Sequence, residues 1–431
     1  MINASEIGGT DTLPRRKLTI RGSTPPVGRK SPLDHPELRW PQYAADEINA
    51  VVDVLKSGRV NSLVHGDHTR QFETEFASFC RMPHAIAVSN GTTALELAMR
   101  ALGIGAGDEV IVPARSFFAT AASVVAVGAV PVFADIDAVS QTIDVESVRA
   151  AICRRTRAIL CVHLAGWPCD MDGLCALARS TGLWLIEDCA QAHGATYAGR
   201  PVGSFGAAAA FSFCTDKIIS TGGEGGMLLL KDRDHWKTAW AFKDHGKNPD
   251  KVFSSAPGSG FRYVHDSFGT NWRMTEMQAA IGRAQLAKLP ATLAARRQNA
   301  TRLMALLAED TRIAVPAIPH HIGHAFYRLY VELAATTNHD AAPVIDRMVR
   351  MGMPVGSGSC ADMSLEAAFD ALPVRKAGPL DVATAAGRRT IAYPVDPLLN
   401  DTDMQRLADC TRIALAELDH RPNQSNRETR S

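Results

Sequence analysis

The sequence lacks an excess of charge of either sign, and it lacks a long apolar run. Its 46 lysines and arginines are balanced by 45 acidic residues, which leaves a formal net charge of +1. Such a balance gives no long-range field that would attract nucleic acid or an anionic membrane. No segment approaches the ~20 consecutive apolar residues that cross a bilayer, and the start of the chain has no apolar signal-peptide core. We therefore expect a cytoplasmic protein with neither nucleic acid nor membrane as a partner.

The sequence also lacks the cysteine and histidine spacings of a disulfide-rich protein or a zinc site. Its nine cysteines are scattered, and several, such as Cys161, Cys189 and Cys214, stand inside apolar runs, as reduced cysteines of cytosolic proteins do. No Cys-x-x-Cys pair is present. The three histidines within residues 320–324 lie in a Pro/Gly-flanked segment without nearby Cys or acidic residues, which favours a solvated or cofactor-edge role over metal binding. We expect no metal.

What the sequence contains is a regular alternation of apolar strands with helical segments, which is typical of an open α/β sheet with ligands at its carboxyl edge. A chain of 431 residues, 46% of them hydrophobic, is long for one domain. We expect strands at 84–90, 108–114, 130–137, 157–166, 183–190, 207–213 and 225–230. The expected domains are an extended N-terminal arm (1–35), a large, mostly parallel seven-stranded α/β/α domain (36–290), a small C-terminal α+β domain (291–420) and a disordered tail (421–431).

One lysine, Lys217, stands between an apolar strand and the glycine-rich residues 222–226. A buried amine loses its proton readily and becomes a nucleophile. The usual partner of such an amine is an aldehyde, and pyridoxal 5'-phosphate (PLP) is the cofactor that supplies one. Taken alone, Lys217 fits a surface lysine at a strand end better, because lysines are seldom buried. The interpretation therefore depends on finding the rest of a PLP site.

A phosphate site is predicted where the first strand meets a helix. Gly91, Thr92 and Thr93 follow the strand and precede a segment with helical apolar spacing. Free backbone N–H groups and hydroxyls at a helix N-terminus favour a phosphate dianion. The alternative is an ordinary N-cap, which Asn90, Thr92 or Thr93 could supply.

An aromatic residue and a carboxylate complete the predicted cofactor site. Phe117 or Phe118 follows the second strand and could stack on a pyridine ring, although either could be a core residue. Asp188 ends another apolar strand, where a carboxylate needs a partner, and a protonated pyridine nitrogen would be one. The alternative role of Asp188 is the N-cap of a following helix.

These segments resemble, in order and spacing, the DegT/StrS family of PLP-dependent sugar aminotransferases, which have fold type I. The similarity covers roughly residues 37–415. It is strongest in SNGTTALELAMRALGIGAGDEVIVPARSFFATA, VHLAGWPCDMDGL, IEDCAQAHGA, FSFCTDK with GGEGGM, and NWRMTEMQAAIGRAQL. The head segment LTIRGSTPPVGRKSP is similar to that of the cyclitol and antibiotic-pathway members.

The resemblance implies a role for each matching residue. Lys217 would form the Schiff base with PLP and move the substrate proton, while Asp188 would hold the pyridinium proton. Gln191 would contact the phenolic oxygen, and Phe117 would stack on the ring. Phosphate contacts would come from Gly91, Thr92, Thr93 and Ser212.

The family pattern also implies a homodimer with shared active sites, because Asn271 matches a residue that reaches the phosphate of the neighbouring subunit's cofactor. Substrate contacts are assigned to His163, His245 and Arg328, although His245 could instead only cap a local turn. Arg328 and Asp396 stand where the family commonly has histidine, and Asp216 precedes the lysine where Ser or Thr is common. Asp216 could tune the Schiff base or point to solvent.

The resemblance implies a transaminase that moves an amino group from glutamate or glutamine to a keto-sugar nucleotide, in amino-sugar biosynthesis for a surface polysaccharide or natural product. A cyclitol or other non-nucleotide ketone is the alternative acceptor. A catalytically silent PLP-fold protein that binds a ligand is a remote alternative, because Lys217, Asp188 and Gln191 are intact. The dehydratase branch of the family, which has histidine in place of the lysine, is disfavoured by Lys217.

Overall fold

The computed structural model describes residue 33 and residues 39–254, 263–337 and 339–420. The described residues belong to one compact unit. The head segment, nearly all of the predicted arm and the predicted tail lie outside the described residues. The division into a large and a small domain at residue 290 stays a prediction.

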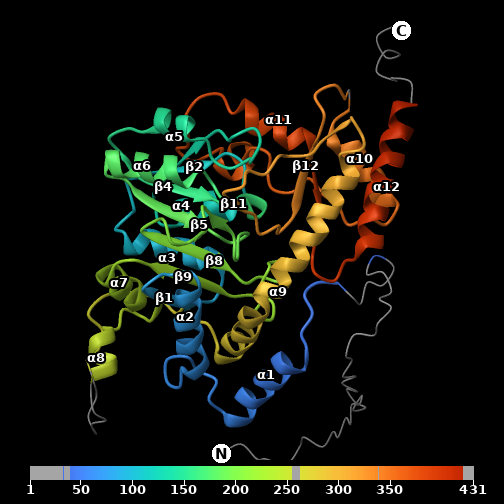
Figure 1. The fold of residues 1–431 in the computed structure, drawn as a ribbon. Helices are drawn as coiled ribbons and strands as arrows, with labels where there is room; N and C mark the ends of the chain where they lie inside the picture. Colours follow the sequence, from blue (N-terminus) through green and yellow to red (C-terminus); the bar gives the residue numbers. More distant parts are fainter. Residues whose placement is uncertain (1–32, 34–38, 255–262, 338, 421–431) are drawn as a thin grey trace, which may run out of the picture. The chain divides into compact units, whose positions relative to one another are not determined.

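A mostly parallel sheet of eight strands forms the centre of the larger part. Figure 1 shows strands of this sheet lying between helices. Strand β9 is antiparallel to both of its neighbours, and the other pairings are parallel. In sheet order the strands are β1 (His84–Val88), β9 (Gly226–Leu230), β8 (Ala208–Ser212), β5 (Trp184–Asp188), β4 (Thr156–Val162), β2 (Glu109–Pro113), β3 (Val130–Ala134) and β13 (Arg375–Lys376).

The seven predicted strands all form, and the α/β class is confirmed. The eighth strand, β13, was not expected. It has only two residues, both basic, and it extends the sheet by pairing Arg375 with Val132 of β3. A strand without an apolar run gives no periodic signal, which is why the count of seven was one too low.

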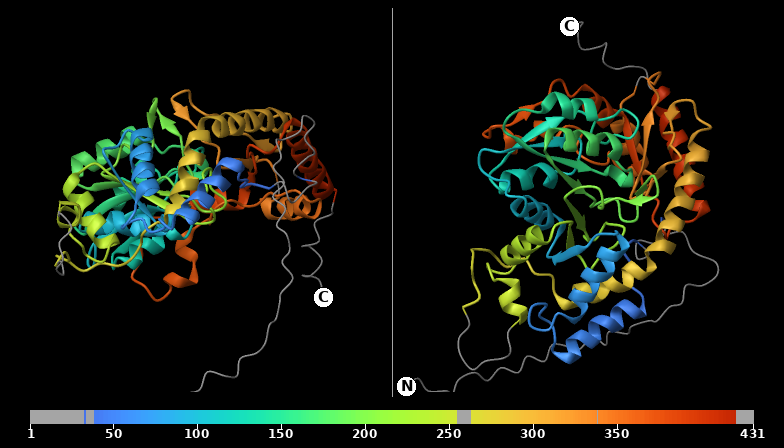
Figure 2. Two further views of the ribbon diagram at one scale, coloured as in Figure 1. Left: turned by 90° about the horizontal axis from the view of Figure 1, so that it is seen from below. Right: turned by 60° about the vertical axis from the view of Figure 1, so that its left-hand side comes forward.

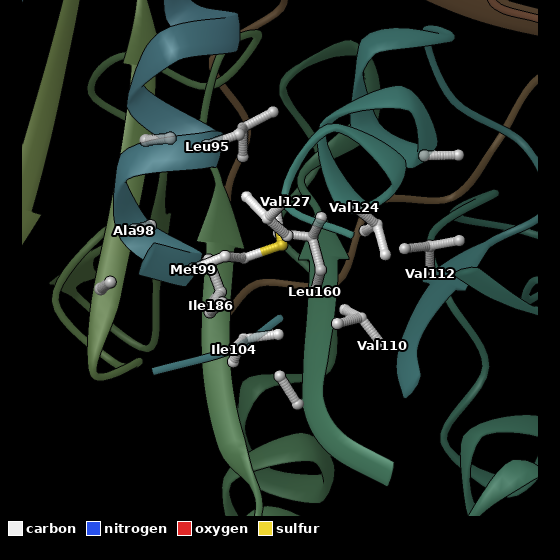
Figure 3. Packing of buried hydrophobic residues seen from close by; sticks show 14 of the residues in the cluster. Leu95, Ala98, Met99, Ile104, Val110, Val112, Val124, Val127, Leu160 and Ile186 are labelled. Carbon is white, nitrogen blue, oxygen red and sulfur yellow. The ribbon is translucent and has the colours of Figure 1, made fainter. Parts of the chain in front are cut away.

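Helices cover both faces of this sheet because alternate residues of each strand point to opposite sides. One face is covered by α3 (Gly91–Ala101), α4 (Ala119–Ala126) and α7 (Arg233–Lys243), and the other by α2 (Asp67–Phe79), α5 (Val145–Ala151) and α6 (Met171–Thr181). Figure 3 shows the packing on the first face, where Met99 of α3 lies among Val127, Leu160 and Ile186. Burying one such side chain stabilises the fold by about 1.5–3 kcal/mol.

The C-terminal part has its own antiparallel sheet of three strands, in the order β10-β12-β14. The strands are β10 (Ile313–Ala314), β12 (Leu329–Leu333) and β14 (Thr390–Tyr393), and the helices packed around them include α10 (Ala341–Arg350) and α12 (Asp401–Asp419). A separate apolar cluster, which includes Leu303, Val331 and Leu407, fills this part.

Helix α9 (Glu276–Leu307) contributes side chains to an apolar cluster under the large sheet and to the C-terminal apolar cluster. Its first half packs against α1 (Ala45–Ser57) and α2, and its second half lies along α12 (Figure 2). Leu289 and Leu293 contribute to the cluster under the large sheet, whereas Leu303 and Leu307 contribute to the C-terminal one. The helix continues through Pro290, the residue at which the two domains were predicted to meet.

The remaining elements are short. They include β6 (Thr196–Tyr197), β7 (Arg200–Pro201) and β11 (Ile322–Gly323), which form a small sheet, together with α8 (Pro249–Ser254) and α11 (Asp381–Arg389). Within the described ranges, none of the helices combines the length and the apolar character that crossing a bilayer requires.

Candidate active site

The carboxyl ends of β1, β2, β5 and β8 meet at a cavity of about 830 Å³. Parallel strands bring their carboxyl ends to one edge of the sheet, so residues far apart in the chain become neighbours there. The opposite wall comes from β12 and residues 354–359. The predicted site residues that line the cavity are Gly91, Thr92, Thr93, Phe117, Asp188, Gln191, Ser212, Lys217 and Arg328.

The N-terminus of α3 forms one end of the cavity. Asn90 is the N-cap: its side-chain oxygen accepts from the Thr93 N–H at 2.9 Å, and the Thr93 hydroxyl donates to the Asn90 carbonyl at 2.8 Å. Gly91 lies so close to β8 that a Cβ atom there would be 2.6 Å from Ser212 Cβ. Capping and anion binding are therefore compatible, since the cap uses Asn90 and leaves the exposed Thr92 at the positive end of the helix dipole.

Asp188 is a buried carboxylate at the end of β5. Its Oδ2 accepts from the Thr120 hydroxyl at 2.9 Å, and its Oδ1 accepts from the Ala190 N–H at 3.1 Å. Burial raises the pKa of Asp188 in spite of these hydrogen bonds. No helix follows Asp188, so the alternative of a helix N-cap is wrong. A positively charged group in the cavity would offset the cost of burying this carboxylate.

The two candidate aromatic residues have different environments. Phe118 packs into the core against Phe369, with ring centroids 5.4 Å apart. Phe117 lines the cavity and is 63% exposed, a large value for a phenylalanine at a strand end. Phe117 is thus the residue whose ring a planar ligand could cover.

Gln191 is held in the cavity wall by a backbone donor. Its Oε1 accepts from the Ala165 N–H at 2.7 Å, which leaves the side-chain NH2 group as the remaining donor. Ala165 has φ 55°, in the left-handed region that costs an L-residue about 1–2 kcal/mol. Strain at this position indicates that the geometry around Gln191 is tightly determined.

Lys217 forms a small charged group with Asp216 and Tyr327. Its Nζ lies 3.5 Å from Asp216 Oδ2 and 4.9 Å from the centre of the Tyr327 ring. The Tyr327 hydroxyl donates to the same Asp216 oxygen. Burial acts to raise the pKa of Asp216, but the charge of Lys217 and the Tyr327 hydrogen bond outweigh it, and the pKa is lowered. Asp216 therefore faces the lysine rather than only the solvent.

His163 does not line the cavity, although it was predicted to contact substrate. It is fully buried, with Nε2 3.1 Å from Glu187 Oε2, and its Nδ1 accepts from the Cys169 N–H at 3.0 Å. This pairing fixes the proton on Nε2. His163, Glu187 and Cys189 have side chains of the types that bind metals, and their potential ligand atoms lie within 4.8 Å of one another. Both ring nitrogens are already used, however, and Glu187 also accepts from three backbone N–H groups.

His245 and Asn271 also lie outside the cavity of this chain. His245 has φ 62° and donates its N–H to the Thr270 carbonyl at 2.9 Å, so it serves a local turn. Asn271 pairs with Asp244 in an isolated backbone bridge.

The histidines of residues 320–324 do not share one environment. His320 and His321 are exposed, as a solvated role requires. His324 is buried and stacked on Phe326, with ring centroids 4.0 Å apart, and burial lowers the pKa of His324 to about 3. The solvated role was therefore wrong for His324.

The wall opposite the sheet was not predicted from the sequence. Tyr327, Tyr330 and residues 354–359 line the cavity beside Arg328. The tyrosines stand in the strand-like segment YRLYVEL, but alternating aromatics are as typical of a core strand as of a site, so no signal separated the two roles.

The chemistry of the lining residues fits PLP. A capped helix N-terminus with nearby hydroxyls suits the phosphate dianion, and the buried Asp188 suits a protonated ring nitrogen. Phe117 offers an uncovered ring, and Lys217 offers an amine in the same cavity. These four groups come from four different strand ends, so chance clustering is a poor explanation.

Comparisons with known proteins match this geometry. The sequence model described as the DegT/DnrJ/EryC1/StrS aminotransferase family matches residues 41–412. The dTDP-3-amino-3,4,6-trideoxy-alpha-D-glucose transaminase of Streptomyces venezuelae is 34% identical over 398 residues, 92% of this chain and 98% of the relative. The L-glutamine:scyllo-inosose aminotransferase of Streptomyces griseus is 39% identical over 303 residues, 68% and 70% of the two chains. The solved aminotransferase from Psychrobacter cryohalolentis superposes with a TM-score of 0.85 at 44% identity, covering 89% of this chain and 99% of that chain.

Proposed function

The chain belongs to the DegT/DnrJ/EryC1/StrS aminotransferase family and is a PLP-dependent transaminase, and from this premise we propose that it aminates a keto-sugar nucleotide. The amino donor is glutamate or glutamine, and the product is an amino sugar for a surface polysaccharide or natural product. One observation carries the proposal: Lys217 and Asp188 lie in one cavity with the N-terminus of α3. The Streptomyces venezuelae relative, whose name gives a dTDP-sugar, supports this class of acceptor.

The residues of this chain have separate tasks in that reaction. When bound, PLP supplies the aldehyde that takes up the amino group and the ring that spreads negative charge from the reacting carbon. Asp188 would keep the proton on the ring nitrogen, and its burial makes that charge pairing strong. The amine of Lys217 would carry the proton between the substrate carbon and the cofactor.

Other residues would hold the cofactor in position. The phosphate would lie at Gly91, Thr92, Thr93 and Ser212, and Phe117 would cover one face of the ring. The amide NH2 of Gln191 would donate to the phenolic oxygen, since its Oε1 is occupied by the Ala165 N–H.

A cyclic ketone without a nucleotide is the second candidate acceptor. The Streptomyces griseus relative is named for scyllo-inosose, a cyclitol ketone, and for L-glutamine as donor. Both acceptor classes present a ring carbonyl, so the same lysine and carboxylate could serve either.

A homodimer in the cytoplasm is the proposed form of the enzyme. Asn271 does not line the cavity of its own chain, and the nearby Phe268 is 98% exposed, as expected for a segment that a second copy covers. All nine cysteines are free thiols, which suits a reducing compartment.

The proposal is tested by the absorption spectrum of the purified protein loaded with PLP. Glutamate or glutamine should remove the visible band of the lysine-bound cofactor, and the correct keto-sugar nucleotide should restore it. Recovery with a cyclitol ketone alone would select the second candidate, and no loss of the band with either donor would contradict the proposal.

A further inference from the structure

A second, smaller cavity of about 180 Å³ adjoins the active-site cavity. The two cavities share Asp216, Tyr327, Arg328 and Pro354 in their walls. The smaller cavity is lined by three arginines, Arg39, Arg296 and Arg328, against two carboxylates, Asp216 and Asp396. It therefore has an excess of positive charge a short distance from Lys217.

Arg296 is an unusual residue because a guanidinium is buried without a carboxylate. It lies on α9, only 2% exposed, and its Nη1 donates to the Phe326 and Tyr327 carbonyls at 3.3 Å each. Its Nε has no hydrogen-bond partner. Burial lowers the pKa of Arg296 to about 10, so the side chain stays charged at neutral pH. Among the described residues, no carboxylate oxygen lies within 4.0 Å of the Arg296 guanidinium, the distance that defines an ion pair.

Arg328 presents a second guanidinium to both cavities. Its backbone N–H donates to the Ala165 carbonyl, and its guanidinium lies 5.6 Å from the centre of the Tyr327 ring. Within the described part of the chain, its side chain has no hydrogen bond and no ion pair. Of the nearby carboxylates, Asp216 pairs with Lys217. Asp396 accepts from the Leu398 N–H through Oδ1, and its charge acts to raise the pKa of Arg296 without forming an ion pair.

We propose that Arg296 and Arg328 form a carboxylate-binding subsite, which holds a carboxylate of a substrate whose reacting group lies at Lys217. This deepens the proposed function and rests on it. A guanidinium matches a carboxylate with two parallel N–H donors. A phosphate dianion fits less well, because Asp216 and Asp396 line the same small space and would repel it. The carboxylate belongs to the amino donor or to a carboxylate-bearing acceptor.

The first test measures binding without any reaction. Glutarate has the carboxylates of glutamate but no amino group, and calorimetry can follow its binding to the PLP-loaded protein. We expect Arg328→Ala and Arg296→Lys each to weaken glutarate binding at least about tenfold. Arg297→Ala is the matched control, since Arg297 is the exposed neighbour of Arg296 on α9 and donates to the His324 carbonyl. Equal affinity in the wild type and both subsite variants, or no binding to the wild type, would overturn the subsite.

The second test identifies which substrate carries the carboxylate. If it is the donor, Arg328→Ala raises the glutamate concentration needed to remove the cofactor band and leaves the acceptor KM unchanged. If it is the acceptor, the opposite pattern appears. Thermal melting shows whether Arg296→Lys is folded. If it is not, Arg328→Ala still tests the subsite, because Arg328 is only partly buried and its replacement should leave the fold intact. The proposed function fails separately, when no keto-sugar nucleotide restores the band, whatever the affinity for glutarate.

Discussion

The two walls of the active-site cavity are built in different ways. On the sheet side, Asp188 is the last residue of β5, and Lys217 lies five residues after the end of the neighbouring strand β8. Hydrogen bonds from the Thr120 hydroxyl and the Ala190 N–H hold the Asp188 carboxylate in place. On the opposite side, residues 354–359 form no helix and only an isolated bridge at Gly356. A rigid wall suits reacting groups that need fixed geometry, and a wall of loops suits the recognition of a particular substrate.

A single buried side chain ties the loop wall to the sheet. The Arg115 guanidinium donates to the carbonyls of Ser357, Ser359 and Cys360 at 3.1, 3.2 and 3.3 Å, and its Nε donates to Gln141. Arg115 follows β2, only two residues before Phe117. The loop that faces the substrate is therefore positioned from the sheet side of the cavity.

The largest effect is expected on the sheet side, at Lys217. Lys217→Ala removes the amine that, as proposed, binds the cofactor and moves the proton, so the visible band should vanish and kcat should fall by on the order of 10²–10⁴ or more. Absorption spectra and initial rates measure both. Lys237→Ala is the control, because Lys237 is a surface residue paired with Asp250. Turnover that survives in Lys217→Ala would mean that another residue carries the chemistry.

Asp188→Asn should have the next largest effect. The amide keeps the size and the hydrogen bond from Thr120 but loses the charge that is proposed to hold a proton on the ring nitrogen. We expect kcat to fall on the order of 10²–10³, as for other buried electrostatic groups, with a much smaller change in the Kd for PLP. Steady-state kinetics and cofactor titration separate the two. Wild-type kcat in this variant would remove the proposed role of Asp188.

Arg115→Ala should change the properties that depend on the loop wall and leave those of the sheet wall nearly unchanged. Three partly buried hydrogen bonds from the guanidinium to carbonyls are lost, so the loop should shift and the acceptor KM should rise about tenfold, while the donor half-reaction and PLP binding stay near wild type. Stability should also fall, by about 1–3 kcal/mol for each carbonyl left without a partner or water. Urea unfolding gives this loss, and Arg115→Lys should recover part of it. A large loss of PLP binding instead would show that the two walls are not separable.

The same contrast explains what the sequence alone could predict. Apolar runs that end in a polar residue predicted the strands β1, β5 and β8. The same runs placed Thr92, Asp188 and Lys217 at the ends of these strands. The loop wall depends on contacts between residues about 240 positions apart, such as Arg115 with Ser357, and no local pattern records such contacts. β13 was missed for the same reason, because two basic residues become a strand only through pairing with β3.

Asp216 connects the two walls, since it pairs with Lys217 on one side and accepts from Tyr327 on the other. Its pKa is lower in the folded chain than its ordinary value of 3.8, so its contribution to stability is present above that value and is lost as the pH falls through the folded pKa. Asp216→Asn should therefore lower Tm slightly at neutral pH, and the difference from wild type should shrink as the pH falls below 3.8. The effect is small because the side chain is 46% exposed and solvent screens the pair. Tyr327→Phe keeps the Asp216 charge and removes one hydrogen bond to it, so the Tm of this variant should lie between those of the wild type and Asp216→Asn. A Tm difference that does not shrink as the pH falls would mean that the Asp216–Lys217 pair does not couple the walls by charge.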